Sequence, residues 1–456
     1  MKAALIRWRA AYGLILCSVL AGCGGGGGSG SGASGVPPSL SALILTPTAA
    51  YVNTGTITVT GTANFTTTSY PLASATVSIL DASGNTVSSS KVPIQDGAST
   101  GSGQILGTGT VTTATAGTFT IQIYVTDTSN QKSNTVSSTF RVADFPWTSQ
   151  SVMPTPRLAA SVVAVGHLFY VLGGLMSGAA PASSLDTVEI FDASTANWST
   201  GIPLPVAMQN IGAATVGGKI YVVAGNTSNG TNVAGSAAIP CSQIKNAYEF
   251  DPTTQTWSMK SALPTPTDGA GIAVIGTKIY VIGGTVGQPL PGQSCPDSVT
   301  PSNGQDLATA QVMVYDTASD TWAAAAPLPS AARLVAAEVV NGKIEAFGGA
   351  STQNGVEQPT LVPLAEYDPA TNTWSARGAT LQWTQSPAAT VNGALYAFSN
   401  TSSMAYDPVK DAWEMKEPLP NHADADLGQS ADVYNGSVYL FDPDETFVYN
   451  PANDIH

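Results

Sequence analysis

The residues after about position 144 repeat a unit in which an aspartate is followed six residues later by a tryptophan. Five copies keep this spacing: Asp192/Trp198, Asp251/Trp257, Asp316/Trp322, Asp368/Trp374 and Asp407/Trp413. Each pair follows short apolar runs, such as residues 279–282, which read as strands. An aspartate at a tight turn caps its own backbone, and a tryptophan packed between sheets buries on the order of 200 Å². Because one such unit cannot bury its apolar faces alone, we expect successive units to pack side by side.

This pattern resembles the kelch repeat, and the resemblance covers about two-thirds of the chain. The resemblance implies a β-propeller of four-stranded blades. The sixth unit reaches Asn450, but the chain ends at His456, where its tryptophan should stand, while Trp147 precedes the first unit in the correct phase. We therefore predict an all-β fold with a six-bladed propeller over residues 144–456, closed by an N-terminal strand that completes the last blade.

Residues 39–143 read as short alternating strands broken by turns, for example residues 56–60, 75–80 and 118–125. About 100 residues in some seven such strands predict an immunoglobulin-like β-sandwich. This region contains no cysteine, so the inter-sheet disulfide of antibody domains is absent. The region is similar to the bacterial immunoglobulin-like domains that serve as stalks.

The first 23 residues combine a basic start with an apolar stretch of roughly a dozen residues, fewer than the ~20 that span a bilayer. They predict a signal peptide. Residues 20–23, Leu-Ala-Gly-Cys, resemble the lipobox of bacterial lipoproteins, which implies lipidation of Cys23 and a Gly/Ser-rich tether over residues 24–38. An ordinary secretory signal is the alternative. The resemblance implies a lipid-anchored location in the bacterial cell envelope, and Gly24 favours the outer membrane, on its periplasmic or surface face.

Charged residues are few, with 16 Lys+Arg against 30 Asp+Glu and a net charge of −14. This balance excludes most nucleic-acid binders, which need a basic face. The 4 Cys and 3 His limit metal sites and nucleophile–base pairs, so we expect no metal and no cofactor.

Long loops are expected between the second and third strands of three units, over about residues 226–244, 285–310 and 350–363. Cys241 and Cys295 fall in the first two of these loops. In an exported protein the pair predicts a disulfide, with two free thiols as the alternative.

Counting nine residues back from each unit's first hairpin predicts the mouth of the central channel. The positions are Arg157, Gln209, Asp268, Arg333, Thr384 and Leu427. Two guanidinium groups, a carboxylate and an amide suit an anionic or hydroxyl-rich ligand. In the alternative, the arginines only bind neighbouring loop carbonyls.

Two further candidates lie nearby. Trp383 is either a sugar-stacking platform or a loop-packing residue. His422, Asp424 and Asp426 form either a cation site or a solvated acidic loop.

These features predict a non-catalytic protein whose propeller binds a carbohydrate or a protein partner at the cell envelope. The alternative is a sugar-acid epimerase or mutarotase resembling N-acetylneuraminate epimerase, in which Arg157, Arg333 and Asp268 would bind a carboxylate and shuttle a proton. Kelch propellers also include copper oxidases, which need two His and two Tyr. The histidines His167, His422 and His456 are too scattered in this sequence for that chemistry.

Overall fold

A computed structural model describes residues 19–21, 35–94, 100–176, 183–227, 242–286, 307–353, 356–378, 381, 383, 386–399, 401–420, 430–443 and 445–456. The chain divides into two compact units, which we describe separately. The first comprises Met1–Phe145 with Asn453–Ile455, and the second comprises Pro146–Ala452 with His456.

The first unit is a sandwich of two β-sheets. One sheet has the order β1 (Val19–Ala21), β7 (Gly101–Thr112), β4 (Thr56–Thr67), β2 (Ser39–Thr46). The other has the order β3 (Ala49–Tyr51), β9 (Val136–Ala143), β8 (Gly117–Asp127), β5 (Leu72–Leu80), β6 (Thr86–Pro93). Alternate residues of these strands point inward. Leu40, Phe65, Leu72, Ile105 and Val125 form part of the buried core between the sheets. Strand β1 comes from the segment that the sequence predicts to be a signal peptide.

Within the described residues, the second unit contains six sheets built on four successive strands each, and the second of these sheets carries β19 as a fifth, short strand. We call these sheets blades 1 to 6 in chain order. Blade 1 contains β12 (Ser161–Val165), β13 (Leu168–Leu172), β15 (Val188–Asp192) and β16 (Asn197–Thr200). Blade 2 contains β17 (Gln209–Val216), β18 (Lys219–Thr227), β20 (Ala247–Asp251) and β21 (Thr256–Lys260). Blade 3 contains β23 (Gly271–Ile275), β24 (Lys278–Ile282), β27 (Val312–Asp316) and β28 (Thr321–Ala325).

The remaining blades follow the same order of strands. Blade 4 contains β29 (Arg333–Val340), β30 (Lys343–Gln353), β31 (Val356–Asp368) and β32 (Thr373–Ala376). Blade 5 contains β33 (Ala388–Val391), β34 (Ala394–Phe398), β35 (Ser403–Asp407) and β36 (Ala412–Lys416). Blade 6 contains β37 (Ala431–Tyr434), β38 (Ser437–Phe441), β39 (Thr446–Tyr449) and β10 (Trp147–Gln150).

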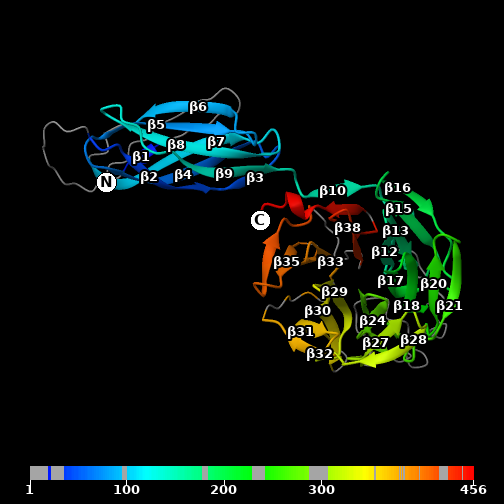
Figure 1. Ribbon diagram of the computed structural model, residues 1–456. Coiled ribbons are helices and arrows are strands. Elements are labelled where there is room, and N and C mark those ends of the chain that lie inside the picture. The colour runs from blue at the N-terminus through cyan, green and yellow to red at the C-terminus, as the bar shows by residue number, and fades with distance from the viewer. Residues whose placement is uncertain are drawn as a thin grey trace. The chain divides into compact units, whose positions relative to one another are not determined.

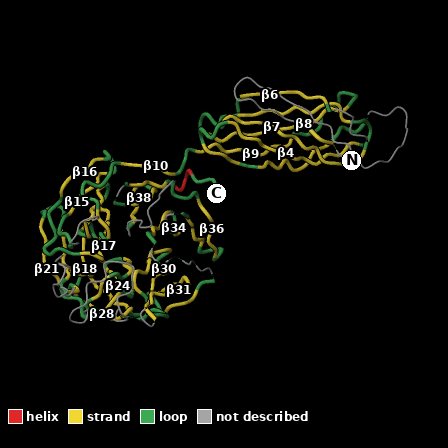
Figure 2. Tube along the Cα trace, turned by 180° about the vertical axis from the view of Figure 1, so that it is seen from behind, coloured by secondary structure: helices red, strands yellow, loops and turns green. Residues whose placement is uncertain are grey.

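The blades are arranged around a common centre, with the first strand of each blade innermost (Figure 1). The same arrangement is visible from behind (Figure 2). Innermost strands contact one another in the order β12, β17, β23, β29, β33 and β37, and β37 also contacts β12. Strand β10 pairs antiparallel with β39. This all-β arrangement fits the predicted β-propeller.

The repeated aspartate caps the turn between the third and fourth strands. In blade 3, Asp316 Oδ1 accepts the backbone N–H of Ala318 at 3.0 Å. Equivalent hydrogen bonds occur in blades 1, 2, 4 and 5, to Ser194, Thr253, Ala370 and Val409. The spacing of six therefore places the tryptophan on the fourth strand, one turn later.

The repeated tryptophan joins adjacent blades. The Trp322 ring lies 4.9 Å, between centroids, from the ring of Tyr315 in the same blade. Its indole N–H donates to the carbonyl of Ser261, just after the outer strand of blade 2, at 2.8 Å. Four other tryptophans donate in the same way to the preceding blade, namely Trp147, Trp198, Trp257 and Trp374. Among the described residues, the buried indole N–H of Trp413 has no such partner.

A pair of glycines directly follows the second strand in blades 1 and 3 and lies within the extended second strand of blade 4. In blade 3, Gly283 has φ +64°, and a Cβ atom there would lie 2.4 Å from the carbonyl oxygen of Ala332 in the next blade. A side chain would collide with this backbone, so only glycine permits the close approach.

Candidate functional site

Blades 1 to 4 carry extra β-ladders at the end where their first strands begin. Strand β11 (Arg157–Leu158) pairs with β14 (Leu175–Met176) in blade 1, and β18 pairs with β19 (Ser242–Gln243) in blade 2. In blade 3, β22 (Thr267–Asp268), β25 (Thr285–Val286) and β26 (Leu307–Ala308) form a small sheet, and in blade 4 the hairpin β30–β31 extends to Gln353 and Val356. We call these four ladders the rim.

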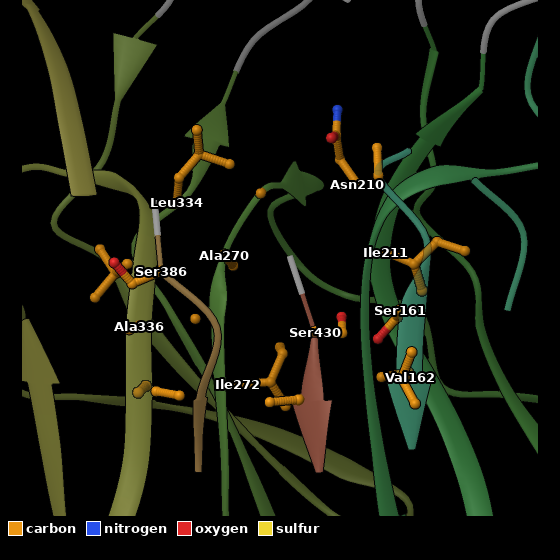
Figure 3. A pocket seen from close by; sticks show the side chains of 18 of the residues that line it. Ser161, Val162, Asn210, Ile211, Ala270, Ile272, Leu334, Ala336, Ser386 and Ser430 are labelled. Atoms are coloured by element: carbon orange, nitrogen blue, oxygen red, sulfur yellow. The ribbon is translucent and has the colours of Figure 1, made fainter. Parts of the chain in front are cut away.

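A cavity of about 170 Å³ lies between the innermost strands, next to the rim. Many of its lining residues are small, such as Ser161, Ala270, Ser386 and Ser430, and larger apolar residues lie between them. Figure 3 shows Asn210 and Leu334 toward one end of the cavity and Val162 and Ile272 toward the other. The cavity is large enough for several water molecules or a small polar group.

Four residues with left-handed backbone surround the rim end of the cavity. They are Ala159, Asn210, Gly269 and Leu334, with φ between +49° and +57°. The N–H of Asn210 donates to the carbonyl of Ala159 at 2.9 Å, and the N–H of Leu334 donates to the carbonyl of Gly269 at 2.6 Å. The N–H of Gly269 donates to the carbonyl of Asn210 at 3.3 Å.

We call these four residues the collar. Its hydrogen bonds link blades 1 to 4 in sequence. Left-handed backbone at non-glycine residues is costly, about 1–3 kcal/mol each, and tends to occur at functional sites.

The predicted ring of ligand-binding side chains is displaced from the cavity. Arg157, Gln209, Asp268 and Arg333 belong to the rim strands or to the first residues of β17 and β29, and none of them lines the cavity. The collar residue follows each of them by one position, or by two in blade 1. The physical reason is the left-handed turn, which interrupts the ladder there and brings the next backbone to the cavity.

Arg157 is fully buried instead of facing a ligand. Its Nη1 lies 2.8 Å from Glu189 Oε2, and its Nη2 donates to the carbonyl of Val171 at 3.2 Å. Burial lowers the pKa of Arg157, and the charge of Glu189 opposes this shift. Glu189 Oε1 also accepts the hydroxyl of Thr155 at 2.9 Å. Neither interpretation of the sequence named Glu189 as the main partner of Arg157. Gln209 is also buried, whereas Asp268 and Arg333 are half-buried.

Trp383 is described by the structure, whereas the predicted mouth residue Thr384 next to it in sequence is not. Trp383 is half-buried and packs against the cluster of Leu364, Leu381 and Leu395, as a loop-packing residue does. The following predicted residues lie outside the described residues: Cys23, Cys241, Cys295, Thr384, His422, Asp424, Asp426 and Leu427.

Two carboxylates on innermost strands were not predicted from the sequence. Glu338, in blade 4, lines the cavity and accepts the hydroxyl of Thr390 in blade 5 at 3.3 Å. Asp432, in blade 6, accepts the backbone N–H of Ala164 in blade 1 at 2.7 Å. Burial and the nearby charge of Asp432 raise the pKa of Glu338 to about 8, and burial also raises the pKa of Asp432.

The sequence did contain a signal for these two carboxylates. Both residues stand two positions before the last residue of a first strand. The other blades have a small or β-branched apolar residue there, namely Val163, Ala214, Ala273 and Ala389. An isolated acid in an apolar column of the repeat is therefore the signal to look for.

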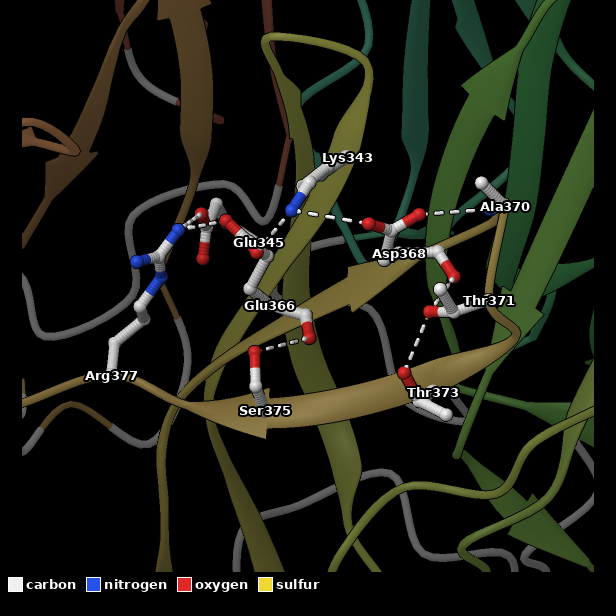
Figure 4. A network of polar contacts seen from close by, with 9 residues as sticks. All are labelled: Lys343, Glu345, Glu366, Asp368, Ala370, Thr371, Thr373, Ser375 and Arg377. Carbon is white, nitrogen blue, oxygen red and sulfur yellow. Dashed lines mark hydrogen bonds and ion pairs between the residues drawn. The ribbon is translucent and has the colours of Figure 1, made fainter.

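Blade 4 also holds a network of charged side chains (Figure 4). Lys343 Nζ lies 2.8 Å from Glu366 Oε1 and 3.2 Å from Asp368 Oδ2. Arg377 pairs with Glu366 and lies 3.9 Å from Glu345, whose pKa is raised by burial. Blade 2 has a similar arrangement, in which Lys219 pairs with Glu249 and Asp251. Because the network recurs within the repeat, we assign it to blade structure. Among the described residues, no group of three or more His, Cys, Asp or Glu could hold a metal ion.

Comparison with known proteins supports the repeat. The model of the Kelch motif matches residues 156–204 and 208–264, which correspond to blades 1 and 2. Kelch-like protein 25 of Xenopus tropicalis is 26% identical over 277 residues, or 59% of this chain and 42% of the relative. Kelch-like protein 35 of Mus musculus is 25% identical over 44% of this chain and 29% of the relative. Kelch-like protein terF of Aspergillus terreus is 26% identical over 39% of this chain and 38% of the relative. The chain spans less than half the length of these relatives.

These relatives also correct the predicted location. They are kelch-like proteins of an amphibian, a mammal and a fungus, not bacterial envelope lipoproteins. The predicted lipid-anchored location in a bacterial envelope is therefore wrong. No helix in the described part of the chain is long and apolar enough to cross a membrane. The motif match to blades 1 and 2, the sheets that the repeats form and these relatives together support a kelch-repeat protein.

Proposed function

We propose that the propeller unit is a non-catalytic protein-binding module and that its partner docks on the rim of blades 1 to 4. Kelch-repeat proteins generally mediate protein binding. The observation that carries the proposal is that, within the described residues, the rim ladders and the collar gather at one end of four adjacent blades. Hairpins held by a rigid scaffold are the usual position for binding residues.

The chemistry of the rim suits a protein surface. Met176, which pairs with Arg157 in the rim ladder of blade 1, is 41% exposed. Leu158 in the same rim ladder is half-buried, as are the collar residues Asn210 and Leu334. Apolar side chains interspersed with amide groups are typical of protein–protein interfaces. The burial of Arg157 argues against the epimerase alternative, because the proposed carboxylate-binding group already pairs with Glu189.

The proposal includes two structural points. We infer that the propeller is a closed ring of six blades, supported by the pairing of β10 with β39 and the contact between β37 and β12. We also infer that the first unit is an immunoglobulin-like sandwich. Its strands pair antiparallel except for β3 and β9, which pair in parallel at the sheet edge.

The test is quantitative affinity capture with cross-linking, using the full chain as bait. The variant Met176→Arg places a charge on the rim, and Met415→Arg places the same charge on an outer strand, where Met415 is 77% exposed. A partner that docks on the rim is lost with Met176→Arg and kept with Met415→Arg. Equal capture by both variants contradicts the rim assignment. A glycan array probed with the same bait shows whether the rim binds a carbohydrate instead.

A further inference from the structure

The edge strands of the sandwich differ in how they are protected from pairing with other chains. Strand β2 is irregular, with a register shift between Ser41 and Ile44 against β4. Strand β6 contains Lys91 and Pro93 and has its own register shift against β5. Strand β3 has only three residues. Bulges, charges, prolines and short length are the usual devices that prevent edge-to-edge association.

Strand β7 has none of these devices. It is twelve residues long and pairs with β4 residue for residue from Gly101 to Thr112, without a register shift. Its sequence, Gly-Ser-Gly-Gln-Ile-Leu-Gly-Thr-Gly-Thr-Val-Thr, contains no charged residue and no proline. A long, regular and uncharged edge is a template for an additional strand.

A short strand already occupies part of this edge. Val19–Ala21 pairs antiparallel with β7, with Val19 opposite Gly107 and Ala21 opposite Ile105. This segment covers three of the twelve positions, and no other described strand pairs with β7 on that side. The structure thus shows the direction and register in which the edge accepts a strand, and the accepted segment, Val-Leu-Ala, is apolar.

An apolar cavity of about 60 Å³ lies between the two sheets and extends from β2 across β4 to β7. At its β7 end, Gly107 and Gly109 line one wall, and Val77 and Ile79 of β5 contribute to the other wall together with β8. Val77 and Ile79 are only half-buried, although they face the opposite sheet. The residues of β6 paired with them are Ser90 and Ser88, which are too small to cover them. Unfilled apolar space that reaches a partly covered edge strand can accept the inward side chains of an added strand.

We propose that β7 is the docking edge for an extended, uncharged and apolar strand of a protein partner. The strand pairs antiparallel with β7 and directs every second side chain toward Val77 and Ile79. Its register follows that of Val19–Ala21, so the residues opposite Ile105, Gly107 and Gly109 face inward, because directly paired residues share one face of a sheet. This site belongs to the first unit and does not depend on the rim.

The probe is a fluorescent peptide that copies residues 14–23, with serine in place of both cysteines and solubilising lysines at one end. It is titrated onto the full chain and onto the full-chain variant V19K/L20K, in which the resident strand should be displaced. We expect binding to both proteins, tighter to the variant. Absence of binding to both proteins overturns the proposal.

Two peptide variants test whether the side chains of the bound strand alternate between facing inward and facing outward. A lysine at the position of Val19, opposite Gly107, should weaken binding at least about tenfold because it directs a charge into apolar space. A lysine at the position of Leu20, opposite Leu106, should change the affinity less than about threefold because it faces outward. Equal losses from the two lysines would mean non-specific association and would overturn the proposal.

Hydrogen–deuterium exchange locates the bound peptide. We expect protection of residues 101–112 and unchanged exchange of β2 and β6. Protection elsewhere overturns the assignment. Protection of residues 101–112 that rises with protein concentration in the absence of peptide would identify the occupant as a second copy of this chain, and would overturn the assignment to a separate partner.

Discussion

Blades 1 to 4 and blades 5 and 6 are built from the same repeat but differ at the end next to the cavity. Within the described residues, the rim ladders and the collar belong to the first four blades, and the positions equivalent to the collar in blades 5 and 6 lie outside the described residues. In blade 5, the second strand returns through a tight turn in which the N–H of Ser399 donates to the carbonyl of Ser402 at 2.9 Å. In blade 6 the second strand ends in a similar turn, in which the N–H of Asp442 donates to the carbonyl of Glu445 at 3.0 Å. A blade therefore does not need a rim ladder to form, so the ladders are additions to the blade, in line with the binding role proposed for the rim.

The two groups of blades meet at two seams, and each seam carries one of the unexpected carboxylates. Glu338 reaches from blade 4 to Thr390 in blade 5. Asp432 reaches from blade 6 to the backbone of Ala164 in blade 1. Each carboxylate accepts a hydrogen bond from a donor group of a neighbouring blade. The arrangement also places two acidic groups near one another. Because burial raises the pKa of both carboxylates, we expect the two seams to be sensitive to protonation.

The largest effect is expected from breaking the buried ion pair at the rim of blade 1. Arg157→Leu leaves Glu189 buried without its cation, which should lower the free energy of unfolding by about 3–5 kcal/mol. The double variant Arg157→Leu/Glu189→Leu should recover most of this loss, because no isolated charge remains. Urea unfolding followed by tryptophan fluorescence measures both. A loss below about 1 kcal/mol in the single variant would show that the pair is not structural.

The next effect tests the glycine pair that leads into the rim ladder of blade 3. Gly283→Ala should cost about 3 kcal/mol, because left-handed backbone is disfavoured and the new Cβ would overlap the carbonyl of Ala332. Gly276→Ala is the matched control, since Gly276 has φ +63° but open space around it, and should cost about 1 kcal/mol. Thermal unfolding distinguishes them. Equal costs would mean that the close approach to the next blade does not matter.

A smaller effect compares the tryptophans of blades 4 and 5. Trp374→Phe removes the hydrogen bond to the carbonyl of Ala326 and should cost about 1 kcal/mol more than Trp413→Phe. The indole N–H of Trp413 has no partner among the described residues, so its removal relieves an unsatisfied group. Both changes remove the same volume. A larger loss from Trp413→Phe, measured by urea unfolding, would contradict the comparison.

The effect of Glu338→Gln is the smallest at pH 5 and grows as the pH rises. Glu338 has a pKa of about 8 in the folded protein and an ordinary value of 4.5 when exposed, so between these values the folded state binds more protons than the unfolded state. The stability of the wild-type protein should therefore fall as the pH rises from 4.5 through about 8. The variant should lose this dependence, leaving that of Asp432. Parallel pH dependences for the two proteins would contradict the shifted pKa.

Much of the fold followed from the spacing of residues. The Asp–Trp interval predicted both the turn and the strand after it, because the aspartate caps its own backbone and the tryptophan must reach the neighbouring blade. The all-β character was likewise predicted from alternation. These features depend on local chemistry that each repeat carries in its own residues.

The site was harder to predict because it depends on backbone shape. Counting back from the hairpins located the rim but missed the collar, since Ala159 and Leu334 are not residue types that signal left-handed backbone. The partner of Arg157 was also missed. Glu189 lies three residues before Asp192, whereas Glu249 and Glu366 lie two residues before their aspartates, so the repeat does not reveal the pairing.

The pairing of β10 with β39 has a consequence for the order of folding. The indole N–H of Trp147 donates to the carbonyl of Glu417, 270 residues later. The outer strand of blade 6, β10, is therefore the first propeller strand to be synthesised, but it can pair only after β39 has been synthesised. Contacts this distant in sequence slow folding. In the interval β10 has no sheet to join, and its short length and exposed Thr148 and Ser149 make it a poor template for aggregation. The first strand of the propeller is therefore one that can remain unpaired during folding with little tendency to aggregate.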